Sequence, residues 1–440
     1  MQGKSNLSGK AVYVVDGNRT PFLKAKGVGT LSASDLAVAA GLPLLMRQPI
    51  SPTDLDEVIL GSAMPGPDEA NIARVVALRL GCGDKVPGFT VMRNCASGMQ
   101  ALDNAAMQIA NGRSQLVLAG GVDAMSHAPL LFNEHMAGWL ARWFSAKNLQ
   151  QRAGLLVKIR PSFFIPVIAL LRGLTDPIVG LNMGQTAENL AYRFGITREA
   201  MDQFANESHQ NLAKAYAEGR MHEVTPIIDK KGNYYAGDDG IRSDSTVEKL
   251  AKLKPFFDKK YGMVTAGNSS QITDGACLLL LASAEAVERH GLTVMGRIVD
   301  SQWAALAPSQ MGLGPVHAAT PILERQGLKP NDLDTWEINE AFAAQVLACL
   351  SAWDDEAYCR QELNLNAVMG APARDRVNQD GGAIAAGHPI GASGARIVLH
   401  VLEQLKQQHG TRGMAAICIG GGQGGAMYVE RTTEVNHYES

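Results

Sequence analysis

Three residues with reactive side chains lie beside glycine-rich stretches of this 440-residue chain. Cys95 stands in Asn-Cys-Ala-Ser-Gly, just before a helix-like pattern, where unpaired backbone N–H groups favour a thiolate. His388 is bracketed by glycine and proline, a setting that suits a rigidly held base better than core packing. Cys418 ends an apolar run, and the glycines after it leave backbone N–H groups free to face an oxyanion. Taken alone, each cysteine is more often an inert core residue than a reactive one.

Two thiols and one imidazole in such turns favour covalent acyl transfer with a separate proton-transfer thiol. One thiolate takes an acyl group, which splits a difficult reaction into two easier steps. Asn339, at the end of another apolar run, could donate to an oxyanion; a plain helix N-cap is the structural alternative. A metal site is a competing hypothesis, but positions 95, 388 and 418 match no zinc spacing. The glycines of 420–425 open no dinucleotide-binding unit.

The segments that must position these residues occur twice along the chain. Residues 43–56 and 321–334 are identical at eight of fourteen positions without a gap. In each copy a helix-like pattern then begins at Ser-Gly and leads into an apolar run, 116–121 in the first copy and 415–421 in the second. We therefore expect two α/β halves that alternate apolar strands with amphipathic helices.

A long region without a counterpart separates the two copies. We expect a first half that comprises residues 1–125 and is completed by about 272–290. Residues 126–271 form an inserted domain, and residues 291–440 form the second half. Within the insert, residues 135–175 contain no Asp or Glu but six Arg or Lys residues and two tryptophans. That composition predicts either a solvated basic loop with an apolar anchor or a surface for membranes, anionic acyl carriers or a partner subunit.

Composition narrows the class of protein further. The formal net charge of −3 argues against a nucleic-acid binder that relies on positive charge. Six cysteines without a CxxC pair predict reduced thiols. No segment is typical of a secretory signal, and no apolar run reaches the roughly 18 residues of a membrane-spanning helix. We therefore expect a cytoplasmic protein.

Five motifs together resemble the thiolase family, and the resemblance covers nearly the whole chain. They are NCASGMQAL around Cys95, AGGVDAMS at the end of the first apolar run, NEAF at 339–342, GHPIGASGAR at 387–396 and CIGGGQGGAM at 418–427. The resemblance implies a five-layered αβαβα thiolase fold built from two duplicated halves. It also implies an inserted loop domain that binds coenzyme A, and a homodimer or homotetramer.

The resemblance assigns a role to each candidate catalytic residue. Cys95 would be the acylated nucleophile, His388 the group that activates it, and Cys418 the acid and base at the α-carbon. Asn339, through a water, and His388 would line one oxyanion hole. The backbone N–H groups of Cys95 and Gly420 would line the other.

The resemblance also implies the substrates. Ser270 falls at the family's serine near the pantetheine amides, and Met183 falls near the bound acyl group. Short-chain biosynthetic members usually carry His where this chain has Asn182. Coenzyme A and acyl-CoA would be substrates, and neither a cofactor nor a metal ion is expected.

The expected reaction is cleavage of 3-ketoacyl-CoA by coenzyme A to acetyl-CoA and a shortened acyl-CoA, a reversible Claisen condensation. Alternatives are an acetyl-CoA acetyltransferase acting on acetoacetyl-CoA, and a catalytically weak acyl-CoA- or lipid-binding protein of the same fold. A decarboxylating condensing enzyme is disfavoured by the second cysteine, Cys418. The long loop and the insertion at 354–377 resemble the thiolase subunits of fatty-acid-oxidation trifunctional complexes, although NEAF and CIGGGQG follow the ordinary soluble type. Those loops favour the degradative direction and a hydratase–dehydrogenase partner subunit.

Overall fold

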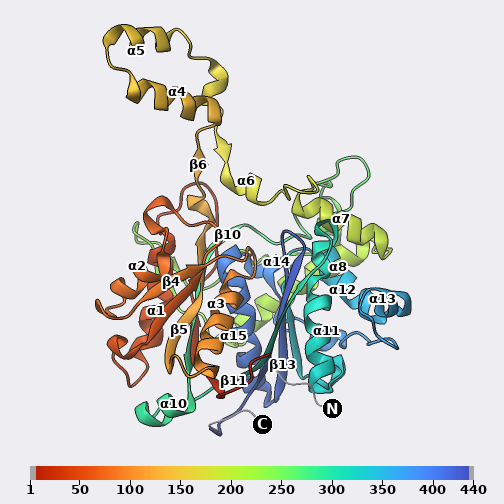
Figure 1. Ribbon diagram of the computed structural model, residues 1–440. Coiled ribbons are helices and arrows are strands. Elements are labelled where there is room, and N and C mark those ends of the chain that lie inside the picture. The colour runs from red at the N-terminus through yellow and green to blue at the C-terminus, as the bar shows by residue number, and fades with distance from the viewer. Residues whose placement is uncertain (1–5, 436–440) are drawn as a thin grey trace.

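The computed structural model describes residues 6–435 (Figure 1), so residues 1–5 and 436–440 of the two expected halves lie outside it. Its main sheet runs in the order β12-β13-β14-β11-β1-β10-β5-β3-β4, with the short β2 (Leu23–Lys24) paired to β10. The two halves meet where β1 pairs antiparallel with β11.

The first half combines strands from distant parts of the chain. Its β10 pairs antiparallel with both β1 and β5, and β3 pairs parallel with β5 and β4. The strands are β1 (Val12–Arg19), β3 (Glu57–Gly61), β4 (Gly88–Val91), β5 (Leu116–Ala124) and β10 (Thr273–Ala282). The helices are α1 (Ala33–Met46), α2 (Ile72–Arg79), α3 (Ser97–Ala110) and α10 (Ala284–His290).

The second half repeats these pairings except that of β3 with β4, since β12 is the edge strand of the described sheet. Its β14 pairs antiparallel with β11 and β13, and β12 pairs parallel with β13. The strands are β11 (Gly296–Ala305), β12 (Thr335–Ile338), β13 (Arg412–Ile419) and β14 (Gln423–Glu430). The helices are α11 (Gly314–Gln326), α12 (Ala343–Asp354), α13 (Glu356–Gln361), α14 (Ala383–Ala386) and α15 (Ile390–Gln408). The predicted duplication is therefore also a duplication of topology.

The halves pack into five layers (Figure 1). Helices α3 and α15 lie against each other between the two half-sheets, and apolar residues of all four elements form one buried cluster. A second cluster of buried apolar residues packs α1, α2 and α10 against the outer face of the first half-sheet. A third packs α11 and α12 against the outer face of the second half-sheet. This order confirms the predicted αβαβα architecture.

The region between β5 and β10 is divided into an arm and a part packed on the body. The arm, residues 130–173, leaves the body on a two-stranded ribbon and projects beyond the five layers (Figure 1). It contains β6 (Leu130–Leu131), α4 (Glu134–Ser145), α5 (Leu149–Leu156), β7 (Val167–Ile168) and α6 (Ala169–Gly173). The packed part contains α7 (Met183–Arg193), α8 (Arg198–Ala217), β8 (Ile227–Ile228), β9 (Tyr234–Tyr235) and α9 (Val247–Ala251). None of the helices within residues 6–435 is long and apolar enough to cross a membrane.

Candidate active site

The candidate catalytic residues converge where the parallel strands of both half-sheets end. Asn339 directly follows β12, and Cys418 is the penultimate residue of the neighbouring β13. Cys95 follows β4 and precedes α3. The Asn94 amide donates to the Gly420 carbonyl across the two halves at 2.9 Å, which holds the Cys95 turn against the end of β13.

Cys95 sits in a constrained turn. Asn94 has a left-handed φ of 44°, and the Arg93 N–H donates to the Ser97 hydroxyl at 2.9 Å. Burial raises the pKa of the half-buried Cys95 thiol to about 11, although a hydrogen bond from the Gly420 N–H opposes the rise. The expectation that the helix terminus makes Cys95 a thiolate is therefore wrong, because burial outweighs it. Cys95 must lose its proton to a base when it reacts.

Gly420 faces Cys95 from the second half. A side chain there would meet the Met183 sulfur, which lies 3.2 Å from the position a Cβ would occupy. A larger residue at position 420 would therefore need the flexible Met183 side chain to shift by a few tenths of an ångström.

Cys418 is fully buried in β13. Burial raises the pKa of its thiol well above the ordinary value, and the nearby thiols of Cys95 and Cys349 raise it further. At neutral pH Cys418 therefore carries a proton that it can give to a carbanion formed beside it.

His388 is a buried neutral imidazole with one nitrogen free. Its Nδ1 lies 2.6 Å from the Ser393 hydroxyl, which itself donates to the Pro389 carbonyl at 3.0 Å. Since that hydroxyl proton is already used, Nδ1–H donates to Ser393, and the lone pair is on Nε2. Nε2 is buried and has no hydrogen-bond partner among the described residues. Burial lowers the pKa of His388 to about 4.

The structure excludes one of the two interpretations of Asn339. The residue that caps α12 is Phe342, so Asn339 is not a helix N-cap. Its backbone N–H donates to Ala416 at 2.9 Å, which fixes the turn beside β13. The side-chain Nδ2 is buried and unpartnered within residues 6–435, so it is available as a donor to an oxyanion or a water.

Ser270 lies next to the turns of Asn339 and His388, and Met183 lies next to Gly420. The Ser270 N–H donates to Ala341 at 2.9 Å, and the next residue, Gln271, accepts the N–H of His388 at 2.9 Å. Met183 begins α7, and Asn182 caps that helix by accepting the Gln185 N–H at 2.9 Å. The Asn182 side chain therefore stabilises the helix start.

Asp123 is a site residue that the sequence analysis missed. This buried carboxylate at the end of β5 accepts the Ser62 hydroxyl at 2.8 Å, the Met64 N–H at 3.0 Å and the Gly391 N–H at 2.5 Å. Burial raises its pKa to about 6 despite these donors. The contact with Gly391 fixes the first turn of α15, which follows His388. The signal that could have identified Asp123 is a single carboxylate in a strand whose residues are all buried.

A second missed anchor is Glu340 of the NEAF motif. It is buried and accepts the Ser208 hydroxyl at 2.6 Å, the Asn378 amide at 2.8 Å and the Ile384 N–H at 3.2 Å. Burial raises its pKa. These contacts hold the turn that presents Asn339.

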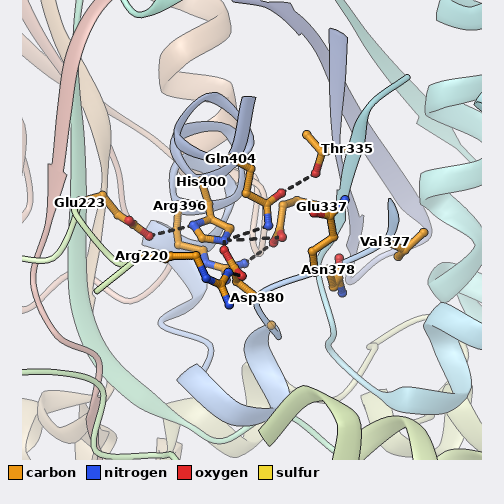
Figure 2. A network of polar contacts seen from close by, with 12 residues as sticks. Arg220, Glu223, Thr335, Glu337, Val377, Asn378, Asp380, Arg396, His400 and Gln404 are labelled. Carbon is orange, nitrogen blue, oxygen red and sulfur yellow. Dashed lines mark hydrogen bonds and ion pairs between the residues drawn. The ribbon is translucent and has the colours of Figure 1, made fainter. Parts of the chain in front are cut away.

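Further along, α15 is held by a buried polar network (Figure 2). Arg396 donates to Glu337 at 2.6 Å, and the Nδ1 of His400 lies 2.9 Å from Glu223 of the packed insert. Burial opposes ionisation of Glu223, but His400 and Arg19 outweigh it and lower its pKa to about 2. Such buried pairs fix geometry more than they add stability. The helix that follows His388 is thus joined to both β12 and the insert.

Among the described residues, no group of three His, Cys, Asp or Glu side chains could hold a metal ion. The described cysteines are all free thiols.

Comparison with known proteins matches the family "Thiolase, N-terminal domain" to residues 12–285 and "Thiolase, C-terminal domain" to residues 292–431. The chain is 40% identical to beta-ketoadipyl-CoA thiolase of Pseudomonas knackmussii, over 96% of this chain and 99% of that protein. It is 37% identical to the mitochondrial trifunctional enzyme subunit beta of Bos taurus, over 95% of this chain and 88% of that protein. The crystal structure of human mitochondrial 3-ketoacyl-CoA thiolase in complex with CoA superposes with a TM-score of 0.83 at 34% identity, covering 98% of this chain and 100% of that one.

Proposed function

The chain belongs to the thiolase family, and we propose that it is an acyl-CoA:CoA C-acyltransferase of fatty-acid β-oxidation. It cleaves 3-ketoacyl-CoA with free coenzyme A to give acetyl-CoA and a shortened acyl-CoA. The observation that carries this function is that the Cys95 turn is hydrogen-bonded to the end of the strand that bears Cys418, where the Cys95 thiol raises the pKa of Cys418. We assign His388 to the same site, because its buried Nε2 has no partner among the described residues.

The first half-reaction transfers the acyl group to the enzyme. His388 Nε2 takes the Cys95 thiol proton, and the sulfur attacks the 3-keto carbon of the substrate. The bond between C2 and C3 breaks, and its electron pair becomes the enolate of acetyl-CoA. Cys418 gives its proton to that carbon, so acetyl-CoA leaves and the acyl group stays on Cys95.

The second half-reaction returns the site to its starting state. The proton on His388 restores the Cys418 thiol. His388 then takes the thiol proton of incoming coenzyme A and passes it to the Cys95 sulfur as the acyl group departs. Protons and charges balance over the cycle.

Two oxyanion sites stabilise the negative charge on oxygen in this scheme. The unpartnered Asn339 amide, through a water, and His388 serve one of them. The backbone N–H groups of Cys95 and Gly420 serve the other, and this is supported by the hydrogen bond between the Asn94 amide and the Gly420 carbonyl, which holds the two turns together.

Coenzyme A is bound, in this proposal, by the inserted domain over 126–271, through its packed part rather than the arm. Ser270 contacts the pantetheine amides and Met183 the acyl group. Their positions beside the Asn339 turn and Gly420 support this assignment. On this division residues 1–125, with about 272–290, form one catalytic half and residues 291–440 the other.

We also propose a homodimer or homotetramer in the cytoplasm, where reducing conditions suit the free thiols. One relative is by its name a subunit of a trifunctional enzyme, which supports a hydratase–dehydrogenase partner subunit here. The arm is the surface available for such a partner or for a membrane.

The test is the rate of thiolysis of 3-ketoacyl-CoA substrates of increasing chain length by purified protein with free coenzyme A. We expect kcat/KM to peak at medium or long chains. Activity confined to acetoacetyl-CoA would instead identify an acetyl-CoA acetyltransferase. An absence of turnover at every chain length would contradict the proposed function and favour an acyl-CoA-binding protein.

Ser393 is expected to keep the proton of the His388 ring on Nδ1, which leaves Nε2 able to accept a proton. In Ser393→Ala the ring loses the acceptor of its Nδ1–H and can place the proton on Nε2, so kcat should fall about tenfold with KM little changed. Ser393→Thr keeps the hydroxyl and should retain most of kcat. Steady-state kinetics and thermal melting check this, because a purely structural role would lower Tm in both variants without separating their kcat values.

A further inference from the structure

The helices that follow the turns of Cys95 and His388 cross in contact at their first turns. Cys95 lies two residues before α3, and His388 lies two residues before α15, the two central helices of Figure 1. A Cβ on Gly98 of α3 would lie 2.7 Å from the carbonyl oxygen of Gly391 in α15, so the two backbones touch there, and glycine permits this approach. The position of His388 relative to Cys95 therefore depends on how the first turn of α15 is held.

One carboxylate holds that first turn from the other half of the protein. The Oδ2 of Asp123, near the end of β5, accepts the Gly391 N–H at 2.5 Å. Its Oδ1 accepts the Ser62 hydroxyl at 2.8 Å and the Met64 N–H at 3.0 Å, which fixes the carboxylate on its own half. The residue at the N-cap position of α15 is Pro389, whose side chain forms no cap hydrogen bond. Asp123 therefore caps α15 from outside and places its negative charge at the positive end of the helix dipole.

The charge of this carboxylate is not explained by support of the fold. Asp123 is fully buried, and its donors among the described residues are a hydroxyl and backbone N–H groups, none of which is charged. Burial outweighs these donors and raises the pKa of Asp123 from its usual value of about 3.9 to about 6. Between these two values the folded protein binds a proton that the unfolded chain releases, so the free energy of unfolding falls as pH rises through this window. Ionised Asp123 therefore costs stability at neutral pH.

We propose that the ionised Asp123 carboxylate is a positioning group, which sets His388 relative to Cys95 by capping α15 across the two halves. When Asp123 takes up a proton, the Gly391 N–H loses its charged acceptor and the start of α15 is held less firmly. Transfer of the Cys95 proton to His388 then slows, and this effect on turnover rests on the proposed function. The loop after β3 and the first turn of α15 give Asp123 neutral donors, whereas the turn before α3 brings the Cys95 thiol, whose pKa the charge of Asp123 raises.

Asp123→Asn should separate activity from stability. If the amide oxygen keeps the donors of Ser62 and Met64, the Nδ2 group meets the Gly391 N–H, so two donors face each other and the cap is lost. We expect kcat for thiolysis to fall about tenfold to a hundredfold with KM little changed, whereas Tm at neutral pH should not fall, because the buried charge is gone. Wild-type kcat should also fall as pH drops through about 6, and the variant should lack this limb of the pH profile.

Asp103→Asn is the matched control. Asp103 is also a buried carboxylate that joins the two halves, since it accepts the Ser301 hydroxyl at 2.5 Å and the Trp303 indole N–H at 2.9 Å. It lies in the middle of α3, away from the start of α15. This variant should lower Tm but keep kcat and its pH profile. An Asp123→Asn enzyme with the kcat of the wild type, or one in which Tm and kcat fall together, would overturn the proposal.

Hydrogen exchange of the intact wild-type protein tests the same contact without turnover and without relying on the variant to fold. After correction for the effect of pH on intrinsic exchange, protection of the peptide that begins α15 should weaken as pH drops through about 6. Asp103→Asn should behave like the wild type. Protection that stays constant over this range would overturn the proposal. Weakened protection in a protein that shows no thiolysis would support the cap and contradict the proposed catalytic function instead.

Discussion

Replacing Cys95 by Ser is expected to lower kcat for thiolysis by about four orders of magnitude or more. The Cys95 thiol, with its pKa near 11, is still far more acidic than a serine hydroxyl. His388 is held as a neutral imidazole, and removing a proton from an alcohol costs it more than removing one from a thiol. Steady-state thiolysis measures the loss, and mass spectrometry of the intact protein should detect no acyl adduct on the variant.

The matched control is Cys82→Ala, which removes another free thiol. Cys82 is buried next to the end of α2 in the outer cluster of the first half, away from the site. This variant should lose some stability but keep kcat. A Cys95→Ser enzyme that retained substantial turnover and an acyl adduct would show that another residue is the nucleophile.

Cys418→Ala is expected to separate acyl transfer from proton transfer. The variant keeps Cys95 and His388, so it should still acquire an acyl group slowly from an acyl-CoA. It lacks the thiol that exchanges a proton with the α-carbon, so thiolysis should fall by roughly 10³- to 10⁴-fold. Exchange of the acetyl-CoA methyl protons in deuterated water, followed by NMR, should be abolished.

Cys349→Ala is the control for this experiment. Cys349 is a buried thiol close enough to Cys418 to influence its pKa, but it gives its own hydrogen bond to Gly312. Its removal should leave α-proton exchange intact. Full thiolysis in Cys418→Ala would contradict the assignment of the second thiol.

The reactive residues could be predicted from the sequence because local chain chemistry marks them. Cys95, His388 and Cys418 stand in glycine-rich turns next to predicted helices and strands, and the resemblance to thiolases implied that they act together. The elements themselves followed the pattern closely, as in β5 (Leu116–Ala124) and β13 (Arg412–Ile419).

What the sequence could not predict depends on burial and on long-range partners. The thiolate expected at Cys95 followed from the helix terminus, whereas its raised pKa follows from surroundings that only the fold defines. Asp123 contacts Gly391 across the two halves, and no local pattern links residues so far apart. The N-cap alternative for Asn339 was excluded only by the observed start of α12 after Phe342.

The arm, too, could be predicted only in part from the sequence. Its charge was evident from the sequence, but the exposure of its apolar residues was not. A buried apolar anchor had been one of the two expectations, and Met136 and Trp139 provide it. Phe144, Leu149 and Val157 lie outside that anchor and are exposed on the surface of the arm.

In the proposed reaction Cys95 carries the acyl group. The most direct measurement mixes the wild-type protein with acetoacetyl-CoA in the absence of free coenzyme A and maps the acyl adduct by peptide mass spectrometry. We expect one acetyl group, on the peptide that contains Cys95, and its release when coenzyme A is added. An acetyl group on a different residue, or turnover without any adduct at Cys95, would contradict it.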